Sequence, residues 1–359
     1  MAQVKRSTRS AVKPFCRILS IDGGGIRGIL PGQILVRLEQ ILQKESGRAD
    51  ARIADYFDLI SGTSTGGILA CILLAPDDKK KKRPRFSAAE AVSLYIDRGD
   101  EVFNRSLFQF FKSGGGLTDE KYSARGLTAA LKVYFQDLKL SELLKPCLIT
   151  AYDINRRKAV FFTQHDAKAA KGKDFYVKDV ARATSAAPTF FEPAQIKSMA
   201  NVHYPLIDGG LFANNPALCA YAEARNFPKK PTAENMLILS LGTGQSKKRY
   251  PYRKAKNWGP IGWIRPIIDI MMSGVSETVD YQLRQIYDTI KARKDYPLPY
   301  LRIEPGLGKA SPDMDDASPK NLIALRDAGR EAAKANDKLL VKFAKQLIAA
   351  GKSRARKKP

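Results

Sequence analysis

Histidine, cysteine and acidic residues are scarce in this 359-residue sequence. It has two histidines, and its four cysteines are widely spaced, with no CxxC pair and no Cys/His cluster. Protein zinc sites use several Cys or His ligands, so a multi-histidine metal site is not expected. The cysteines lie in apolar surroundings, and we expect them to be buried free thiols, as is typical of a reducing cytosol.

Long apolar runs are also missing. The longest one, "ILACILLAP" from Ile68, is far shorter than the roughly 20 residues that span a bilayer. The first residues, "MAQVKRSTRSAVKPF", are basic and lack the apolar region of a secretory signal peptide. The sequence therefore predicts a cytoplasmic protein without a signal peptide or a transmembrane helix.

The shortage of acidic residues leaves a large positive charge. Lys and Arg number 61 against 36 Asp and Glu, which gives a net charge of +25. The excess is concentrated in residues 77–86, in residues 246–256 and in the tail from Lys352. Such stretches attract anionic lipid surfaces or nucleic acid, or serve only as solvated loops that aid solubility. The sequence leaves these three interpretations open.

Apolar strand patterns alternate with helical patterns along the chain, which predicts an α/β fold with a mostly parallel central sheet flanked by helices. The expected strands lie within residues 16–22, 56–64, 146–154, 158–164, 203–210, 236–244 and 300–304. One expected helix begins near Pro31, and the others cover residues 65–75, 87–103, 123–135, 177–187, 261–292 and 320–350. Without an internal repeat or a long linker, a single domain over residues 14–350 is expected, with basic flexible tails at 1–13 and 351–359.

The first strand runs into a glycine-rich loop, "DGGGIRG". Its Gly23-x-Gly25-x-x-Gly28 spacing fits a dinucleotide-binding fingerprint, but backbone N–H groups at a helix start stabilise any anion. A dinucleotide site also needs an acidic residue at the end of the second strand. Here the second strand ends in "GTSTG", and the nearest acidic candidate, Glu45, falls at the end of the first helix. An oxidoreductase is therefore disfavoured.

The "GTSTG" stretch, Gly62 to Gly66, is a GxSxG pattern between a strand and an apolar helix. This context is typical of a nucleophile elbow, in which a sharp turn exposes the serine at the end of the strand. Ser64 would then lie at the positive end of a helix, where developing negative charge is favoured. We therefore interpret Ser64 as a nucleophile.

A serine hydroxyl needs a base before it can attack at neutral pH. One alternative is a triad in which His203 acts with Asp153, Asp166 or Asp179, although none of these aspartates lies in a distinctive loop. The other is Asp208, at the end of an apolar strand and followed by two glycines. That position is typical either of an Asx-turn residue or of a carboxylate aimed into a cleft. The local pattern alone leaves these two interpretations of Asp208 open.

In combination and order, these motifs resemble those of the patatin-like phospholipase family, in its bacterial branch. The resemblance rests on Asp22-Gly23-Gly24-Gly25-Ile26-Arg27-Gly28, Gly62-Thr63-Ser64-Thr65-Gly66 and Asp208-Gly209-Gly210, with support from "ATSAAPTFFEPA" and "LSLGTG". It extends from about residue 15 to residue 245. The family often has Asp-Gly-Ala where this chain has Asp-Gly-Gly, which is a mild departure.

The resemblance implies a three-layer hydrolase fold and a lipid acyl hydrolase with a Ser64–Asp208 dyad. It implies that Gly23, Gly24 and Gly25 form the oxyanion hole, joined by the N–H of Thr65, and that Arg27 stabilises either the oxyanion or the lipid phosphate. The implied substrate is a phospholipid or another acyl ester, and no metal or organic cofactor is implied. Peripheral binding to an anionic membrane would use the basic stretches.

Some similar bacterial proteins are membrane-degrading effectors of antiphage defence that a cyclic nucleotide activates. The resemblance thus raises a cyclic nucleotide activator as a further expectation, with Arg249, Arg253 or Lys256 as its contacts. The remaining alternative is a nucleic-acid-binding protein that uses "KKRYPYRKAKNW", where aromatic and basic residues interleave. The enzyme interpretation accounts for more of the motifs, so nucleic acid is the less favoured partner.

Overall fold

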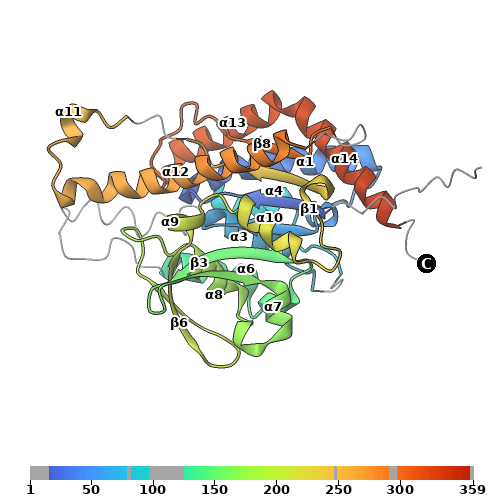
Figure 1. Ribbon diagram of the computed structural model, residues 1–359, viewed down its shortest axis with the longest axis horizontal. Helices are drawn as coiled ribbons and strands as arrows, with labels where there is room; N and C mark the ends of the chain where they lie inside the picture. Colours follow the sequence, from blue (N-terminus) through green and yellow to red (C-terminus); the bar gives the residue numbers. More distant parts are fainter. Residues whose placement is uncertain (1–15, 79–81, 97–124, 246–248, 291–296, 356–359) are drawn as a thin grey trace, which may run out of the picture.

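A computed structural model describes residues 16–78, 82–96, 125–245, 249–290 and 297–355. Eight strands of these residues form one sheet, in the order β5-β6-β3-β2-β1-β7-β8, with β4 paired to β3 (Figure 1). The strands are β1 (Cys16–Ile21), β2 (Leu59–Gly62), β3 (Cys147–Asp153), β4 (Lys158–Thr163), β5 (Ala194–Lys197), β6 (His203–Asp208), β7 (Met236–Leu241) and β8 (Tyr300–Ile303). The pairs among β8, β7, β1, β2 and β3 are parallel, and those of β4, β5 and β6 are antiparallel.

Helices cover both faces of the sheet, so the expected three-layer α/β architecture is confirmed. The longer ones are α1 (Ile29–Ser46), α3 (Thr65–Leu74), α4 (Ala88–Ile96), α6 (Arg125–Phe135), α8 (Val177–Thr184), α10 (Ala217–Arg225), α12 (Pro260–Asp288), α13 (Pro319–Ala335) and α14 (Asp337–Ala355). Shorter ones are α2 (Ile53–Tyr56), α7 (Gln164–Ala169), α9 (Gly210–Ala213) and α11 (Tyr252–Ala255). None of the described helices is long and apolar enough to cross a membrane.

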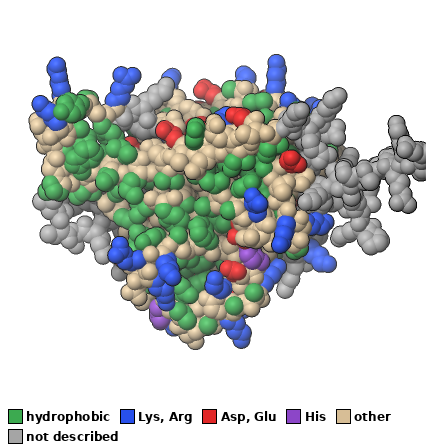
Figure 2. Space-filling model, in the orientation of Figure 1, with side chains coloured by type: hydrophobic (Ala, Val, Ile, Leu, Met, Phe, Trp, Pro, Cys, Tyr) green, Lys and Arg blue, Asp and Glu red, His purple; other side chains and the backbone are tan. Residues whose placement is uncertain are grey.

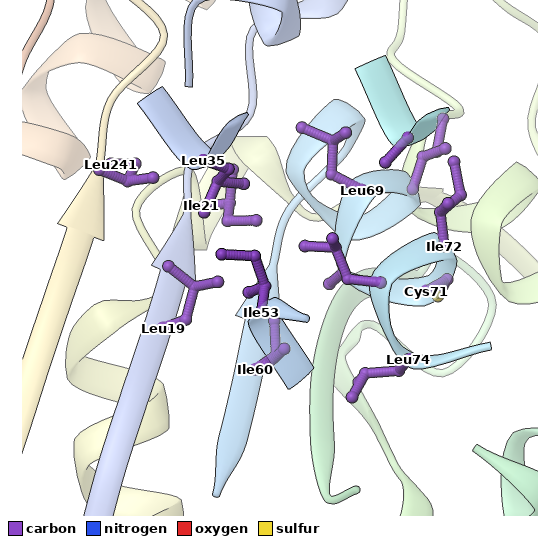
Figure 3. Packing of buried hydrophobic residues seen from close by; sticks show 14 of the residues in the cluster. Leu19, Ile21, Leu35, Ile53, Ile60, Leu69, Cys71, Ile72, Leu74 and Leu241 are labelled. Atoms are coloured by element: carbon purple, nitrogen blue, oxygen red, sulfur yellow. The ribbon is translucent and has the colours of Figure 1, made fainter. Parts of the chain in front are cut away.

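Buried apolar side chains of the strands join one of two cores, because successive residues of a strand face opposite sides of the sheet. In β1, Leu19 and Ile21 belong to the larger core, under α1, α3, α13 and α14. Ile18 belongs to the smaller core, with residues of α10 and α12. Figure 3 shows the larger core, where Leu19 and Ile21 face Ile60 and Leu69. Strands β1, β2 and β7 are buried along their whole length and therefore on both faces of the sheet.

The structure refines two of the predicted helices and adds one strand. The helix predicted over residues 320–350 is two helices, because the Asn336 side chain donates to the Ala332 carbonyl (2.9 Å) and ends α13. The predicted helix over residues 177–187 ends at Thr184, before Pro188. Strand β5 was not predicted. Helix α14 runs to Ala355, inside the predicted tail, and residues 1–13 lie outside the described residues.

Strand β3 brings two distant segments together. It pairs with β4 along one edge, while its other edge is shared by β2 and then by β6. Ile149 of β3 is in register with Gly62, the last residue of β2, and Ala151 is in register with Asp208, the last residue of β6. The register therefore places the turn after Gly62 beside Asp208.

The turn after β2 allows α3 to approach β1 very closely. A Cβ added at Gly66 would lie 2.2 Å from the Ile21 carbonyl oxygen, which is a backbone atom that cannot rotate away. We predict that Gly66→Ala lowers the free energy of unfolding by at least about 3 kcal/mol, because overpacking against backbone forces the helix off the sheet. Urea denaturation followed by circular dichroism measures this loss.

The matched control is Gly274→Ala in α12, where an added Cβ would meet nothing within 4 Å. Alanine is favoured over glycine in a helix, so this variant should gain up to about 1 kcal/mol. A Gly66→Ala variant as stable as the parent would show that α3 does not need this close contact.

Candidate active site

Ser64 occupies a strained turn between β2 and α3. Its φ of 53° and ψ of −124° are unusual for a residue other than glycine, and such strain is typical of nucleophile elbows. Its backbone N–H donates to Thr184 Oγ1 at 2.9 Å, and the residue is only 7% exposed. The turn thus holds Ser64 in one orientation at the carboxyl edge of the sheet.

Asp208 ends β6 and is buried. Its N–H donates to the Ala186 carbonyl at 2.9 Å, and its Oδ1 accepts the Gly210 N–H at 2.7 Å. The bond to Gly210 is the Asx-turn pattern that the sequence raised. Its Oδ2 has no hydrogen-bond partner that meets normal geometry among the described residues. One carboxylate oxygen therefore shapes the loop, while the other is available for chemistry.

The environment of Asp208 makes its carboxylate a base near neutral pH. Burial raises the pKa to about 7, and the neighbouring Ser64 side chain and the Gly210 N–H lower it to a smaller extent. Desolvation disfavours the charged form of a carboxylate and so strengthens its hold on a proton. A pKa near 7 suits a general base that works at neutral pH.

The end of α8 and the residues just after it form hydrogen bonds with the backbone of both Ser64 and Asp208. Thr184 accepts the Ser64 N–H through its side chain, and Ala186, two residues later, accepts the Asp208 N–H through its carbonyl. Sequence reasoning assigned no role to Thr184 or Ala186. The only signal was the stretch "ATSAAPTFFEPA", quoted for its likeness to a family and not for its function.

The glycine loop lies directly against Ser64. A Cβ added at Gly23 would be 3.2 Å from Ser64 Cβ, and Gly25 lines the same pocket as Ser64. Gly23 donates its N–H to the Asn214 carbonyl at 3.1 Å, so this donor is already used. Within the described ranges, the N–H groups of Gly24, Gly25 and Thr65 have no acceptor. These three are the donors that the conformation leaves for an oxyanion.

Arg27 lies on the other side of the glycine loop. It lines a polar cavity of about 220 Å³ together with Asp269, Ser273 and Glu304, and its Nε donates to the Gly24 carbonyl at 3.4 Å. Burial lowers its pKa, and the carboxylates nearby raise it to a smaller extent. In this arrangement Arg27 holds the glycine loop through its hydrogen bond to the Gly24 carbonyl. Direct contact of Arg27 with an oxyanion remains a prediction.

An ion pair anchors the start of the glycine loop to the last strand. Arg302 of β8 donates to both oxygens of Asp22, at 2.8 and 2.7 Å, and to Ser240 Oγ at 2.8 Å. Burial raises the pKa of Asp22 to about 6, although Arg302 lowers it. Sequence reasoning missed Arg302, because it lies in the last third of the chain, where no motif marks it.

Comparisons with known proteins agree with this geometry. The family model described as patatin-like phospholipase matches residues 19–221. "Patatin-like protein 2" of Arabidopsis thaliana is 36% identical over 88% of this chain and 82% of its own length. "Patatin group J-1" of Solanum tuberosum is 32% identical over 98% of this chain and 94% of its own length. The chain belongs to the patatin-like phospholipase family.

Membership in this family supports lipid acyl hydrolase activity. The predicted family and fold class are thereby confirmed, whereas the bacterial branch and a cyclic nucleotide activator are not. A structural comparison also finds VipD from Legionella pneumophila, with a TM-score of 0.43 and 13% identity over 91% of this chain and 67% of the other.

The patatin-like site opens into an apolar pocket. Ser64 and Asp208 share its lining with side chains from several helices and loops, which are Ile68, Leu127, Phe190, Phe191, Leu211, Ile268, Met272 and Met314. Apolar surroundings of this kind favour an acyl chain over a polar substrate. The same apolar side chains exclude water from Asp208. The features that suit an acyl chain are therefore also those that raise the pKa of Asp208.

Neither histidine belongs to this pocket. His203 starts β6 and is exposed, five residues before Asp208, which corresponds to about 17 Å along an extended strand. His165 lies in α7, where its Nε2 is 3.0 Å from Glu223. Among the aspartates proposed for a triad, Asp153 accepts a hydrogen bond from the Arg156 guanidinium and not from a histidine. The geometry therefore favours Asp208 over either histidine as the partner of Ser64.

The Asp22–Arg302 pair gives a first test of the site. We predict that Arg302→Ala lowers the free energy of unfolding by about 3–5 kcal/mol, because Asp22 is left buried without its cation. Arg284→Ala is the matched control, since its ion pair with Asp280 is exposed and contributes only about 0.5 kcal/mol. Equal losses in urea denaturation of the two variants would contradict the anchoring role of Arg302.

The raised pKa of Asp208 gives a second test, through stability. The folded state holds the Asp208 proton more tightly than the unfolded chain, so this group reduces stability as pH rises from about 4 to about 7. Asn carries no charge and retains an oxygen for the Gly210 N–H. We predict that Asp208→Asn is more stable than the parent by about 2–4 kcal/mol at pH 8.

The gain should nearly disappear near pH 4, where Asp208 is protonated in the folded state and about half protonated in the unfolded chain. Thermal unfolding at pH 4, 6 and 8 measures this dependence. A gain that is the same at all three values would show that Asp208 is not the titrating group.

Proposed function

We propose that this protein hydrolyses the acyl esters of phospholipids with Ser64 as nucleophile and Asp208 as base. The observation that carries the proposal is the buried Asp208 Oδ2, without a well-formed partner, next to a strained serine and with a pKa of about 7. Such a carboxylate accepts a proton from the serine without a histidine between them. The apolar pocket beside these residues suits the acyl chain of such a substrate.

Asp208 accepts the Ser64 proton as Oγ attacks the ester carbonyl. The oxyanion that forms accepts hydrogen bonds from the N–H groups of Gly24, Gly25 and Thr65, which already point away from other acceptors. Fixed donors of this kind stabilise developing charge because they do not need to reorganise. The lysolipid or alcohol then leaves with the proton from Asp208, and the acyl group remains on Ser64.

Water completes the cycle. Asp208 takes a proton from the water as it attacks the acyl-enzyme, and Ser64 regains a proton when the fatty acid leaves. The same donors stabilise the second oxyanion. No step in this cycle requires Arg27 to touch the substrate. Its role in the cycle is to hold the glycine loop through the hydrogen bond to the Gly24 carbonyl.

Peripheral binding to an anionic membrane is part of the proposal. The net charge of +25 supports it, as do the exposed basic side chains of residues 249–256. Residues 79–81, 246–248 and 356–359 of the basic stretches lie outside the described residues. The expected cyclic nucleotide contacts Arg249, Arg253 and Lys256 are exposed, and no further feature of the structure favours that activator or a role in antiphage defence.

The dyad is tested by hydrolysis of p-nitrophenyl butyrate and of phospholipid vesicles. We predict that Ser64→Ala loses at least about a thousandfold in kcat and Asp208→Asn at least about a hundredfold, whereas His203→Ala stays within twofold of the parent. The kcat/KM of the parent should rise with pH through about 7, since the base must be deprotonated.

His203→Ala is the matched control, because it removes the other candidate base from the same strand. An inactive His203→Ala with an active Asp208→Asn would replace the dyad with a triad. Activity that survives Ser64→Ala would reject the nucleophile itself.

A further inference from the structure

The first half of α12 exposes a continuous apolar face. Ile261 is 73% exposed, Ile264 46% and Ile267 48%, and Trp263, Ile270 and Met271 are also exposed. Positions 264, 267 and 271 recur at the three- and four-residue spacing that places side chains on one side of a helix. Scattered apolar side chains are normal on a protein surface, but a contiguous face marks a place of interaction.

This face projects from the body of the molecule. Figure 1 shows α11 and the first turns of α12 extending past the sheet, and Figure 2 shows apolar side chains gathered there with Lys and Arg around them. Aromatic residues are concentrated in the same segment. Trp258 packs edge-on against Tyr250 and Trp263, and Tyr252 is 80% exposed.

The charge beside this face is mainly positive. Residues 249–271 include five Lys or Arg and one acidic residue, Asp269, which accepts a hydrogen bond from Tyr250; Arg249, Arg253, Lys254 and Lys256 are exposed. Apolar, aromatic and basic residues in one segment are the combination that binds the interface of an anionic bilayer. A second copy of the same face would bring like charges together, so self-association is disfavoured.

Helix α12 also reaches the apolar pocket. Ile268 and Met272 line the pocket that contains Ser64 and Asp208, whereas their neighbours Ile267 and Met271 are exposed. A lipid at the exposed side of the helix is therefore one helix width from the pocket. Apolar side chains of α12 therefore contribute both to the exposed face and to the lining of the pocket.

We infer that α11 and the first half of α12 form the surface that docks this protein onto an anionic membrane and delivers lipid to Ser64. The docking part stands on the exposed face alone, and the delivery part rests on the function proposed above. The side chains of Ile261, Ile264 and Ile267 insert among the lipid acyl chains, and the basic side chains of the segment face the anionic headgroups.

Vesicle flotation tests the docking in a Ser64→Ala background, so that no lipid is hydrolysed. The probes are vesicles of phosphatidylcholine alone and of an equimolar mixture with phosphatidylglycerol. We expect Ile261→Ser/Ile264→Ser/Ile267→Ser to lower binding to the mixed vesicles at least tenfold, because three apolar side chains no longer enter the interface.

The matched control replaces exposed apolar residues of other helices, in Val133→Ser/Ile323→Ser/Leu339→Ser. It should change binding less than twofold. Equal losses in the two triple variants, or no loss in either, would overturn the inference. A parent that is dimeric in light scattering, with the α12 variant monomeric, would also overturn it, because the face would then join two copies.

Charge has its own pair of variants. Arg253→Gln/Lys254→Gln/Lys256→Gln should lower binding to the mixed vesicles by about fivefold per residue and leave binding to phosphatidylcholine unchanged. The control, Lys171→Gln/Lys229→Gln/Lys230→Gln, removes three exposed lysines from another part of the surface and should have a small effect. Equal effects of the two sets would point to net charge alone and would overturn the role of α11.

The delivery step is tested with Ser64 restored. The α12 variant should lose at least tenfold in hydrolysis of mixed vesicles and stay within twofold of the parent on monomeric p-nitrophenyl butyrate. An equal loss on both substrates would overturn delivery. Should the parent not hydrolyse either substrate, the proposed function fails, while flotation in the Ser64→Ala background still decides whether the face docks.

Discussion

The burial of Asp208 is the constraint on which the site depends. A carboxylate holds a proton near neutral pH only where water and cations are kept away from it, yet it must also touch the hydroxyl that it deprotonates. The structure meets both requirements with backbone bonds: the Ala186 carbonyl accepts the Asp208 N–H, and the Gly210 N–H donates to one carboxylate oxygen. The position of the side chain is thus fixed without an ion pair, which would have lowered the pKa.

Asp22 shows the opposite solution in the same molecule. Asp22 directly follows β1 and Asp208 is the last residue of β6; glycines come after both, and both are buried. Asp22 is paired with Arg302, whereas the structure gives Asp208 no cation among the described residues. The Asp22 carboxylate is thus tied to β8, whereas Asp208, which we propose as the base, has no cation beside it among the described residues. The environments of the two buried aspartates differ by one arginine from β8.

The pairing of Arg302 with Asp22 could not be predicted from the sequence. Ser64 was predictable because the elbow is local: the strand, the glycines and the apolar helix are neighbours in sequence. The approach of Asp208 to Ser64 depends on the register of β3, and the cation of Asp22 comes from a residue 280 positions away. Local patterns contain neither fact. Continuous apolar strands were predictable for the same reason, whereas β5 has only four residues that alternate in burial and gives too short a pattern.

Helix α12 connects the remaining parts of the site. Its Ser276 accepts a hydrogen bond from Asn214 Nδ2 at 3.0 Å, and the Asn214 carbonyl accepts the Gly23 N–H at 3.1 Å. Two hydrogen bonds therefore join this helix to the glycine loop, which we propose supplies oxyanion donors. The same helix lines the apolar pocket and bears the face that we infer meets the membrane. Under this proposal, a movement of α12 at a bilayer would reach both the apolar pocket and the proposed oxyanion donors, because the helix lines the pocket and is hydrogen-bonded through Asn214 to the glycine loop.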